Sequence, residues 1–188
     1  MTARSSLAAA LILSSAIAQP VILAAQAPTT ASPPAAAKDV ASAEAIVAAV
    51  YDALSGTATQ ERNWDRFRSL FIADGRLMPT GVPQGGKARI RVMTPAEYAR
   101  VAAPQLKAEG FYEREVSRVT ESFGTIVHVF STYESRHAPN DPQPFGRGIN
   151  SFQLFNDGSR WWVVSVLWDR ERPGNPLPAK YLPSSARK

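Results

Sequence analysis

Cysteine is absent from this chain of 188 residues, and histidine occurs only twice. Without cysteine the chain can form no disulfide bond and can carry no lipid-modified cysteine anchor. The two histidines, His128 and His137, are nine residues apart and have no acidic residue at ligand spacing. Metal ligands usually come as closely spaced sets of such side chains, so neither a metal site nor a cofactor is predicted.

Three sequence patterns of common function classes are also missing. No run of basic residues occurs, and the net charge of +5 comes from basic residues scattered among acids, so no nucleic-acid partner is predicted. Residues 81–87 (GVPQGGK) have the letters of a phosphate-binding loop, but Ala88 follows where a Mg²⁺-binding hydroxyl is required. No G-x-S-x-G occurs, which argues against a serine hydrolase of the nucleophile-elbow type.

No apolar run is long enough for a stable membrane span, and the most apolar part of the chain lies at its start. Arg4 precedes mostly small, apolar residues at 7–18 and 21–25, with small-residue cleavage patterns that end at Ala18 and Ala27. This arrangement is typical of a secretory signal peptide. We therefore predict a signal at 1–27, cut after Ala18 or Ala27, and a periplasmic or secreted protein without membrane contact after its removal.

The rest of the chain divides into a linker, one domain and a tail. Residues 28–42 begin with PTTASPPAAAK and are predicted to be a disordered linker. The domain is predicted at 43–172, with helices that start at Ser42, Asn63 and the capping box Thr94-Pro95-Ala96-Glu97. Residues 173–188 are predicted to be an extended, proline-rich tail in which Tyr181 and Leu182 contact the body.

Residues 147–170 (RGINSFQLFNDGSRWWVVSVLWDR) predict a β-hairpin on which the domain is centred. A two-residue turn at Asp157-Gly158 would place Asn150 opposite Ser165, as a polar pair on an otherwise apolar face toward the helices. The opposite face would carry Trp162, Val164, Val166 and Trp168. Because an exposed apolar face of this size needs cover, we predict a homodimer through the outer face of the sheet.

A second predicted hairpin turns near Gly124 and places Glu115 beside Tyr133 on the inner face. A carboxyl group next to a tyrosine in a dry pocket could transfer protons. The alternative is that Glu115 forms an ordinary ion pair with Arg114 or Arg118. A slip of one residue at the turn would exchange the two faces of this hairpin.

The order of elements, helices followed by four long strands, indicates an α+β fold in which a curved antiparallel sheet wraps around about three helices. The segments NWDRFRSLF, ADGRL and NDGSRWWVVSVLWD resemble the nuclear transport factor 2-like superfamily of cystatin-like cones, in its SnoaL-like branch. The resemblance spans roughly residues 43–171. It implies a conical pocket between helices and sheet, and commonly a dimer. The acid–base residues of the superfamily's enzymes have no counterpart here that can be matched residue by residue.

Three functions are compatible with these observations. The first is an exported cone that binds a small apolar molecule, with a ligand-binding set of Trp64, Tyr98, Glu115, Tyr133, Asn150 and Ser165. The second is an isomerase or dehydratase that uses a pocket carboxylate, Glu115 or Asp169, as its base. The third is a non-catalytic dimeric scaffold whose pocket is filled by its own side chains.

Overall fold

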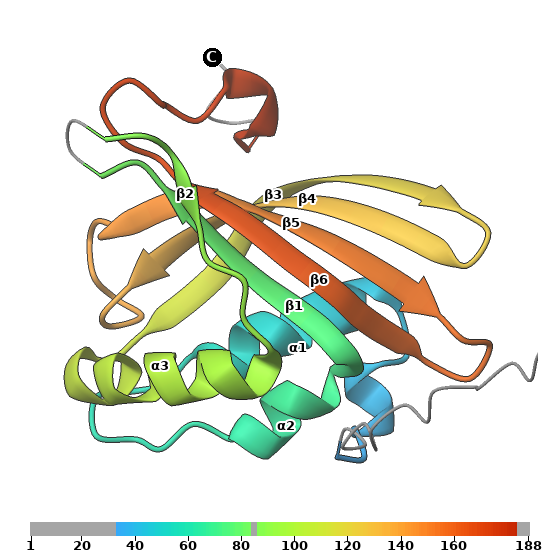
Figure 1. Cartoon of the computed structure of the whole chain (residues 1–188). Coiled ribbons are helices and arrows are strands. Elements are labelled where there is room, and N and C mark those ends of the chain that lie inside the picture. The colour runs from blue at the N-terminus through green and yellow to red at the C-terminus, as the bar shows by residue number, and fades with distance from the viewer. Residues whose placement is uncertain (1–32, 84–85, 184–188) are drawn as a thin grey trace, which may run out of the picture.

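A computed structural model describes residues 33–83 and 86–183 (Figure 1). The predicted signal peptide and the first residues of the predicted linker lie outside this part. The described helices are η1 (Ala37–Asp39), α1 (Ala43–Leu54), α2 (Trp64–Ser69), α3 (Pro95–Glu109) and η2 (Ala179–Tyr181). The described strands are β1 (Phe71–Gly81), β2 (Arg89–Ile90), β3 (Tyr112–Phe123), β4 (Ile126–Arg136), β5 (Gly146–Asn156) and β6 (Trp161–Arg170).

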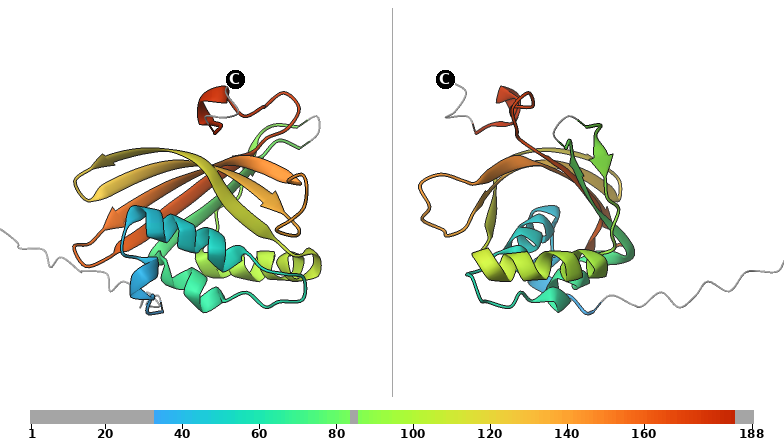
Figure 2. Two further views of the ribbon diagram at one scale, coloured as in Figure 1. Left: turned by 180° about the vertical axis from the view of Figure 1, so that it is seen from behind. Right: turned by 60° about the vertical axis from the view of Figure 1, so that its left-hand side comes forward.

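The strands form one curved sheet in the order β2-β1-β6-β5-β4-β3. Its neighbouring strands are antiparallel except for β1 and β6, which are parallel. Helices α1, α2 and α3 all lie on the concave side, under the arch of the sheet (Figure 2). The predicted α+β class with a curved sheet over three helices is therefore confirmed, with one parallel pair that was not predicted.

Each of the three predicted helix starts has its cap. The side chains of Ser42 and Asn63 accept hydrogen bonds from the backbone N–H groups three residues on, at 3.0 and 2.9 Å. Thr94 and Glu97 form the complete capping box, and Gly110 follows α3 with a φ of 71°. These local hydrogen bonds satisfy backbone donors that have no partner inside the helix, which is why the sequence signals were reliable.

The core lies between the concave face and the helices, and its largest fully buried side chains include Phe67, Phe71, Phe152 and Ile46. The folded part starts earlier than the predicted residue 43. Asp39 is only 5% exposed and forms an ion pair with Arg66 at 2.7 Å, and the carbonyl of Val40 accepts from Trp161 N–H. Within the described ranges, no helix combines the length and apolar character needed to cross a bilayer.

The register of the β5–β6 hairpin differs from the prediction in two ways. The last pair is Asn156 with Trp161, so four residues form the loop instead of two. The Asp157 side chain accepts hydrogen bonds from the N–H groups of Ser159 and Arg160, which closes this wider turn. A β-bulge then inserts one extra residue in β6, between Val163 and Ser165.

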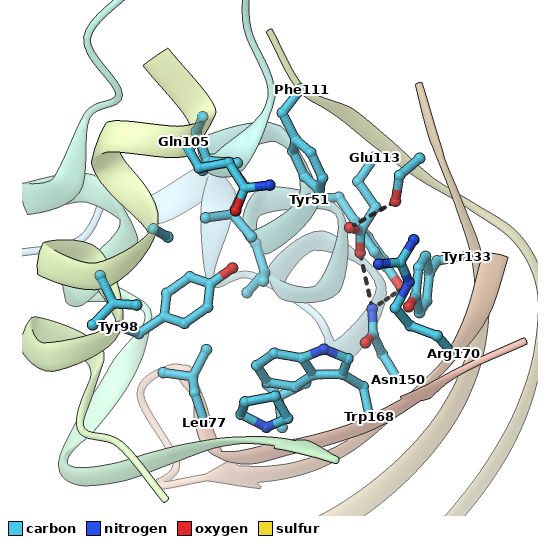
Figure 3. A pocket seen from close by; sticks show the side chains of 18 of the residues that line it. Tyr51, Leu77, Tyr98, Gln105, Phe111, Glu113, Tyr133, Asn150, Trp168 and Arg170 are labelled. Carbon is cyan, nitrogen blue, oxygen red and sulfur yellow. Dashed lines mark hydrogen bonds between the residues drawn. The ribbon is translucent and has the colours of Figure 1, made fainter. Parts of the chain in front are cut away.

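The bulge reverses which residues of β6 face the helices. Asn150 lies opposite Trp168, and Ser165 lies opposite the exposed Gln153, so the predicted Asn150–Ser165 pair is wrong. Val166 is 4% exposed on the inner face, whereas Leu167 is 38% exposed on the outer one. The outer face predicted to carry Val166 and Trp168 therefore lacks both. The two side chains line the cavity inside the domain, and Figure 3 shows Trp168 there.

Strand β3 also contains a bulge, and it decides where two glutamates point. Near the turn, Phe123 pairs with Ile126. The register at this end of the hairpin therefore differs from the predicted one by an odd number of residues, which exchanges the two faces of β3 there. The extra residue, Val116, restores the predicted faces further along, so that Glu115 lies opposite Tyr133 and Glu113 opposite Ser135. Both carboxylates therefore start from the concave side of the sheet.

Candidate functional site

A cavity of about 330 Å³ lies between α1, α3 and the concave face of the sheet. Most of its wall is apolar, formed by Val50, Leu54, Leu77, Met93, Leu106, Phe152, Val166 and Trp168. The polar side chains that interrupt this wall include Tyr51, Tyr98, Glu113, Tyr133, Ser135 and Asn150, and Arg91, Gln105, Glu109, His137 and Arg170 also line the cavity. An apolar cavity with few convergent polar groups is the usual form of a site for a small organic molecule.

Glu113 points into this cavity (Figure 3), whereas Glu109, the other acid of the lining, is exposed at the end of α3. The Oε1 of Glu113 accepts a hydrogen bond from Asn150 Nδ2 at 3.1 Å, and its Oε2 accepts one from Ser135 Oγ at 3.2 Å. Burial raises the pKa of Glu113 to about 7, against the opposing effects of these two hydrogen bonds and the charge of Arg170. Near neutral pH the group therefore exists in both protonation states, as a general acid or base requires.

Two phenols, those of Tyr98 and Tyr133, line the same cavity without a hydrogen-bond partner among the described residues. The hydroxyl of Tyr98 points into the open space from α3, across the cavity from Glu113 (Figure 3). Burial, followed by the charge of Glu113, raises the pKa of both phenols above the ordinary tyrosine value. Both therefore remain protonated and can donate a hydrogen bond to a bound molecule.

Asn150 connects Glu113 to a chain of hydrogen bonds that runs through the core. Its Nδ2 also donates to the hydroxyl of Tyr51 at 3.1 Å, and that hydroxyl lies 2.7 Å from Ser131 Oγ. Ser131 Oγ in turn donates to Glu115. Tyr51, Ser131 and Asn150 are all buried, with at most 7% of each exposed.

Glu115, at the end of this series of hydrogen bonds, determines which group donates and which accepts in each of them. Glu115 forms an ion pair with Arg118 at 2.5 Å, and a carboxylate can only accept. Ser131 must therefore donate to Glu115 and accept from Tyr51, whose hydroxyl then accepts from Asn150. This order fixes the amide of Asn150 with its NH₂ group toward Glu113, where it favours the ionised carboxylate.

The structure brings three of the six predicted ligand-binding residues to the cavity: Tyr98, Tyr133 and Asn150. Trp64 is partly buried and packs against Phe67 of the core, with ring centroids 5.8 Å apart, and does not line the cavity. Glu115 is held by Ser131 and Arg118, as its alternative reading proposed. Ser165 lies on the outer face because of the bulge in β6.

Glu113, Ser135, Trp168 and Arg170 line the cavity but were not predicted. A signal for Glu113 was present, because the alternation that directs Glu115 inward does the same for the residue two positions earlier. No comparable signal existed for Trp168 and Arg170, since their inward direction depends on the bulge in β6.

Asp169, the other predicted base, is outside the cavity lining and is paired with Arg172 at 2.6 Å. Burial acts to raise the pKa of Asp169, but the hydrogen bonds from Arg172 and from the N–H of Arg170 outweigh it and lower that pKa. The described part of the chain also holds no group of three or more histidines and acids that could bind a metal ion.

No protein-family model and no curated protein matches this sequence. Among solved structures, a protein of unknown function with a cystatin-like fold from Nostoc punctiforme PCC 73102 superposes with a TM-score of 0.51 at 12% identity. The match covers 67% of this chain and 86% of that one. An NTF-2 like protein of unknown function from Silicibacter pomeroyi DSS-3 gives a TM-score of 0.47 at 14% identity, over 70% and 94% of the two chains.

At such low identity these matches concern the fold alone. The first of them has the same cystatin-like architecture that the strand order and the three helices give here. The SnoaL-like branch within that superfamily stays a prediction. The chain thus has the fold of the nuclear transport factor 2-like, cystatin-like cones, as the sequence resemblance predicted.

Proposed function

We propose that this cone binds a small, largely apolar molecule and moves a proton on it, with Glu113 as the acid–base group. The observation that carries the proposal is the carboxyl group of Glu113, which has a pKa of about 7 inside an apolar cavity. An acid kept in both protonation states serves proton transfer, whereas a purely structural carboxylate is normally paired and ionised. The ion-paired Glu115 and Asp169 of this chain provide that contrast.

The reaction class that fits is an isomerisation or dehydration that starts at a carbon next to a carbonyl group. Ionised Glu113 would take the proton from this carbon, and the carbonyl oxygen would gain negative charge. The phenol of Tyr98 is placed to donate a hydrogen bond to such an oxygen from the opposite wall (Figure 3). Protonated Glu113 then returns the proton to another atom of the substrate or to a leaving hydroxyl group.

A general-base probe can test this proposal before the substrate is known. In 5-nitrobenzisoxazole, a carboxylate removes the C–H proton, the N–O bond breaks and a coloured cyanophenolate forms. We expect kcat/KM for this elimination to rise with pH through an apparent pKa near 7. Glu113→Gln should lower it by about 100-fold or more, the usual contribution of a positioned base.

Glu121→Gln is the matched control, since Glu121 lies on the same strand but is exposed and outside the cavity lining. It should leave the rate unchanged. A Glu113→Gln protein that remains folded and as active as the wild type would show that Glu113 is not the base.

Pure binding without chemistry is the second candidate, supported by the empty volume of about 330 Å³. The same space disfavours a scaffold whose pocket is filled by its own side chains. Export and dimer formation are further parts of the proposal and rest on the sequence. Intact-mass analysis of the secreted protein should find a start at Gln19 or Pro28, and sedimentation at micromolar concentration should find a dimer.

A further inference from the structure

Arg170 differs from the other arginines near it, because its guanidinium has neither an ion pair nor a hydrogen bond among the described residues. Its neighbours are matched: Arg136 with Glu134, Arg147 with Glu171 and Arg172 with Asp169. Arg170 is exposed, so its charge is hydrated in the absence of a ligand. Its charge acts on Glu113 and lowers the pKa of that group, but no carboxylate of the described residues forms an ion pair with it.

The position of Arg170 is at the border of two hollows. One is the apolar cavity, and the other is a polar hollow lined by Glu134, Arg136, Gln143, Arg147 and Glu171. Arg170 and Phe145 line both. The guanidinium also lies against the backbone of Gly146, where an added Cβ would be only 2.7 Å from Nη2. This contact limits where the guanidinium can lie.

We infer that the ligand of this cone is an amphipathic organic acid, whose apolar body fills the cavity and whose carboxylate binds Arg170 at the border of the polar hollow. In the lining of the polar hollow, Arg136 pairs with Glu134 and Arg147 pairs with Glu171, so the charge of Arg170 remains in excess. One excess positive charge suits a ligand with a single anionic group. A guanidinium presents parallel N–H donors that match the two oxygens of a carboxylate. Glu113 lines the apolar cavity alone, whereas Arg170 lines both hollows, so a carboxylate can bind Arg170 from the side of the polar hollow.

This inference rests on the proposed function for one point only, that the cavity holds the reacting molecule. It narrows the substrate class to acids that carry a reactive carbon within their apolar part. Binding measurements test it without any catalysis. A protein that prefers acids but moves no proton would refute the proposed function and leave this inference standing.

The experiment compares two probes with the same apolar body, 2-naphthylacetate and 2-naphthylacetamide, by titration calorimetry at pH 6. We expect the wild-type protein to bind the acid about tenfold more tightly than the amide, the usual value of one charge-assisted pairing. Arg170→Gln should remove this preference while affinity for the amide stays the same. Arg170→Lys keeps the positive charge but not the paired N–H donors, and should therefore keep part of the preference for the acid.

Two controls separate Arg170 from general effects of charge. Arg100→Gln removes an arginine that forms no ion pair with the residues that the structure describes and lies on α3 outside both hollows, so the preference should persist. The preference should also persist in Glu113→Gln. Equal binding of the two probes by the wild type, binding of neither, or an unchanged preference in a folded Arg170→Gln protein would each overturn the inference.

Discussion

At the scale of single residues, Glu113 carries a free-energy cost that the cavity imposes on it. Its neutral form is favoured in the folded protein, since burial raises its pKa from 4.5 to about 7. The unfolded chain releases the proton at lower pH than the folded chain. Stability that is present below pH 4.5 is therefore lost as the pH rises to about 7.

The first residue-scale prediction uses this linkage. Between pH 4.5 and 7 the free energy of unfolding of the wild type should fall by up to roughly 3 kcal/mol relative to that of Glu113→Gln. Urea denaturation of the two proteins at several pH values measures the difference. Carboxylates with lowered pKa, such as Asp39, are common to both proteins and cancel. Parallel stability curves would show that the pKa of Glu113 is not raised.

Asn150 offers a second prediction at this scale. With Tyr51→Phe its amide loses the acceptor that holds the NH₂ group toward Glu113, and it can turn its oxygen to the protonated acid. We expect the pKa of Glu113 to rise further, because the ionised form loses a donor. Carbon NMR of the carboxyl group measures this, with Tyr181→Phe on the distant tail as control. If the pKa of Glu113 falls or stays constant, the donor and acceptor roles assigned to Tyr51 and Asn150 are wrong.

At the scale of elements, local signals predicted more than long-range ones. The caps at Ser42, Asn63 and Thr94 could be read from the sequence, since each satisfies a backbone donor within three residues. The bulges in β3 and β6 could not, because the alternation of residues along a strand does not show where one residue is inserted. Asn150 on β5 and Tyr133 on β4 were placed on the correct face, because the extra residue in β6 does not change their direction. Ser165 lies on β6 beyond the extra residue, so its predicted face was wrong.

Gly148 gives the element-scale prediction, because it lets β5 approach both neighbours. A Cβ there would lie 2.3 Å from the Asp169 carbonyl oxygen and 2.7 Å from the Tyr133 hydroxyl. Gly148→Ala should destabilise the fold by about 1–3 kcal/mol, the typical cost of overpacking. Gly81→Ala is the control, since no atom of the described residues lies within 4 Å of its added Cβ. Equal midpoints of urea unfolding in the two variants would show that the sheet adjusts freely.

At the scale of the whole molecule, the two sides of the sheet have different cover. The helices lie on the concave side, while the C-terminal tail lies over the convex side (Figure 1). The cavity is on the side of the helices. On the convex side, the carbonyl of Tyr181 accepts from Thr132 Oγ1 at 2.8 Å, and its ring packs on Phe130 at 5.0 Å. The predicted contact of Tyr181 is confirmed, and it lies on β4, not on the β6 residues for which a partner subunit was predicted.

Docking of the tail leads to the last prediction. Thr132 is only 1% exposed, and Thr132→Val keeps its shape but removes the hydrogen bond to Tyr181. The tail should then open more often, by about tenfold for each 1.4 kcal/mol lost. Trypsin cleavage after Lys180, followed by mass spectrometry, reports this opening as long as reclosing is faster than cleavage. Thr120→Val, on exposed β3, is the control and should leave the rate unchanged. If both variants are cleaved like the wild type, contact with Phe130 holds the tail without the hydrogen bond, and Phe130→Ala should then release it.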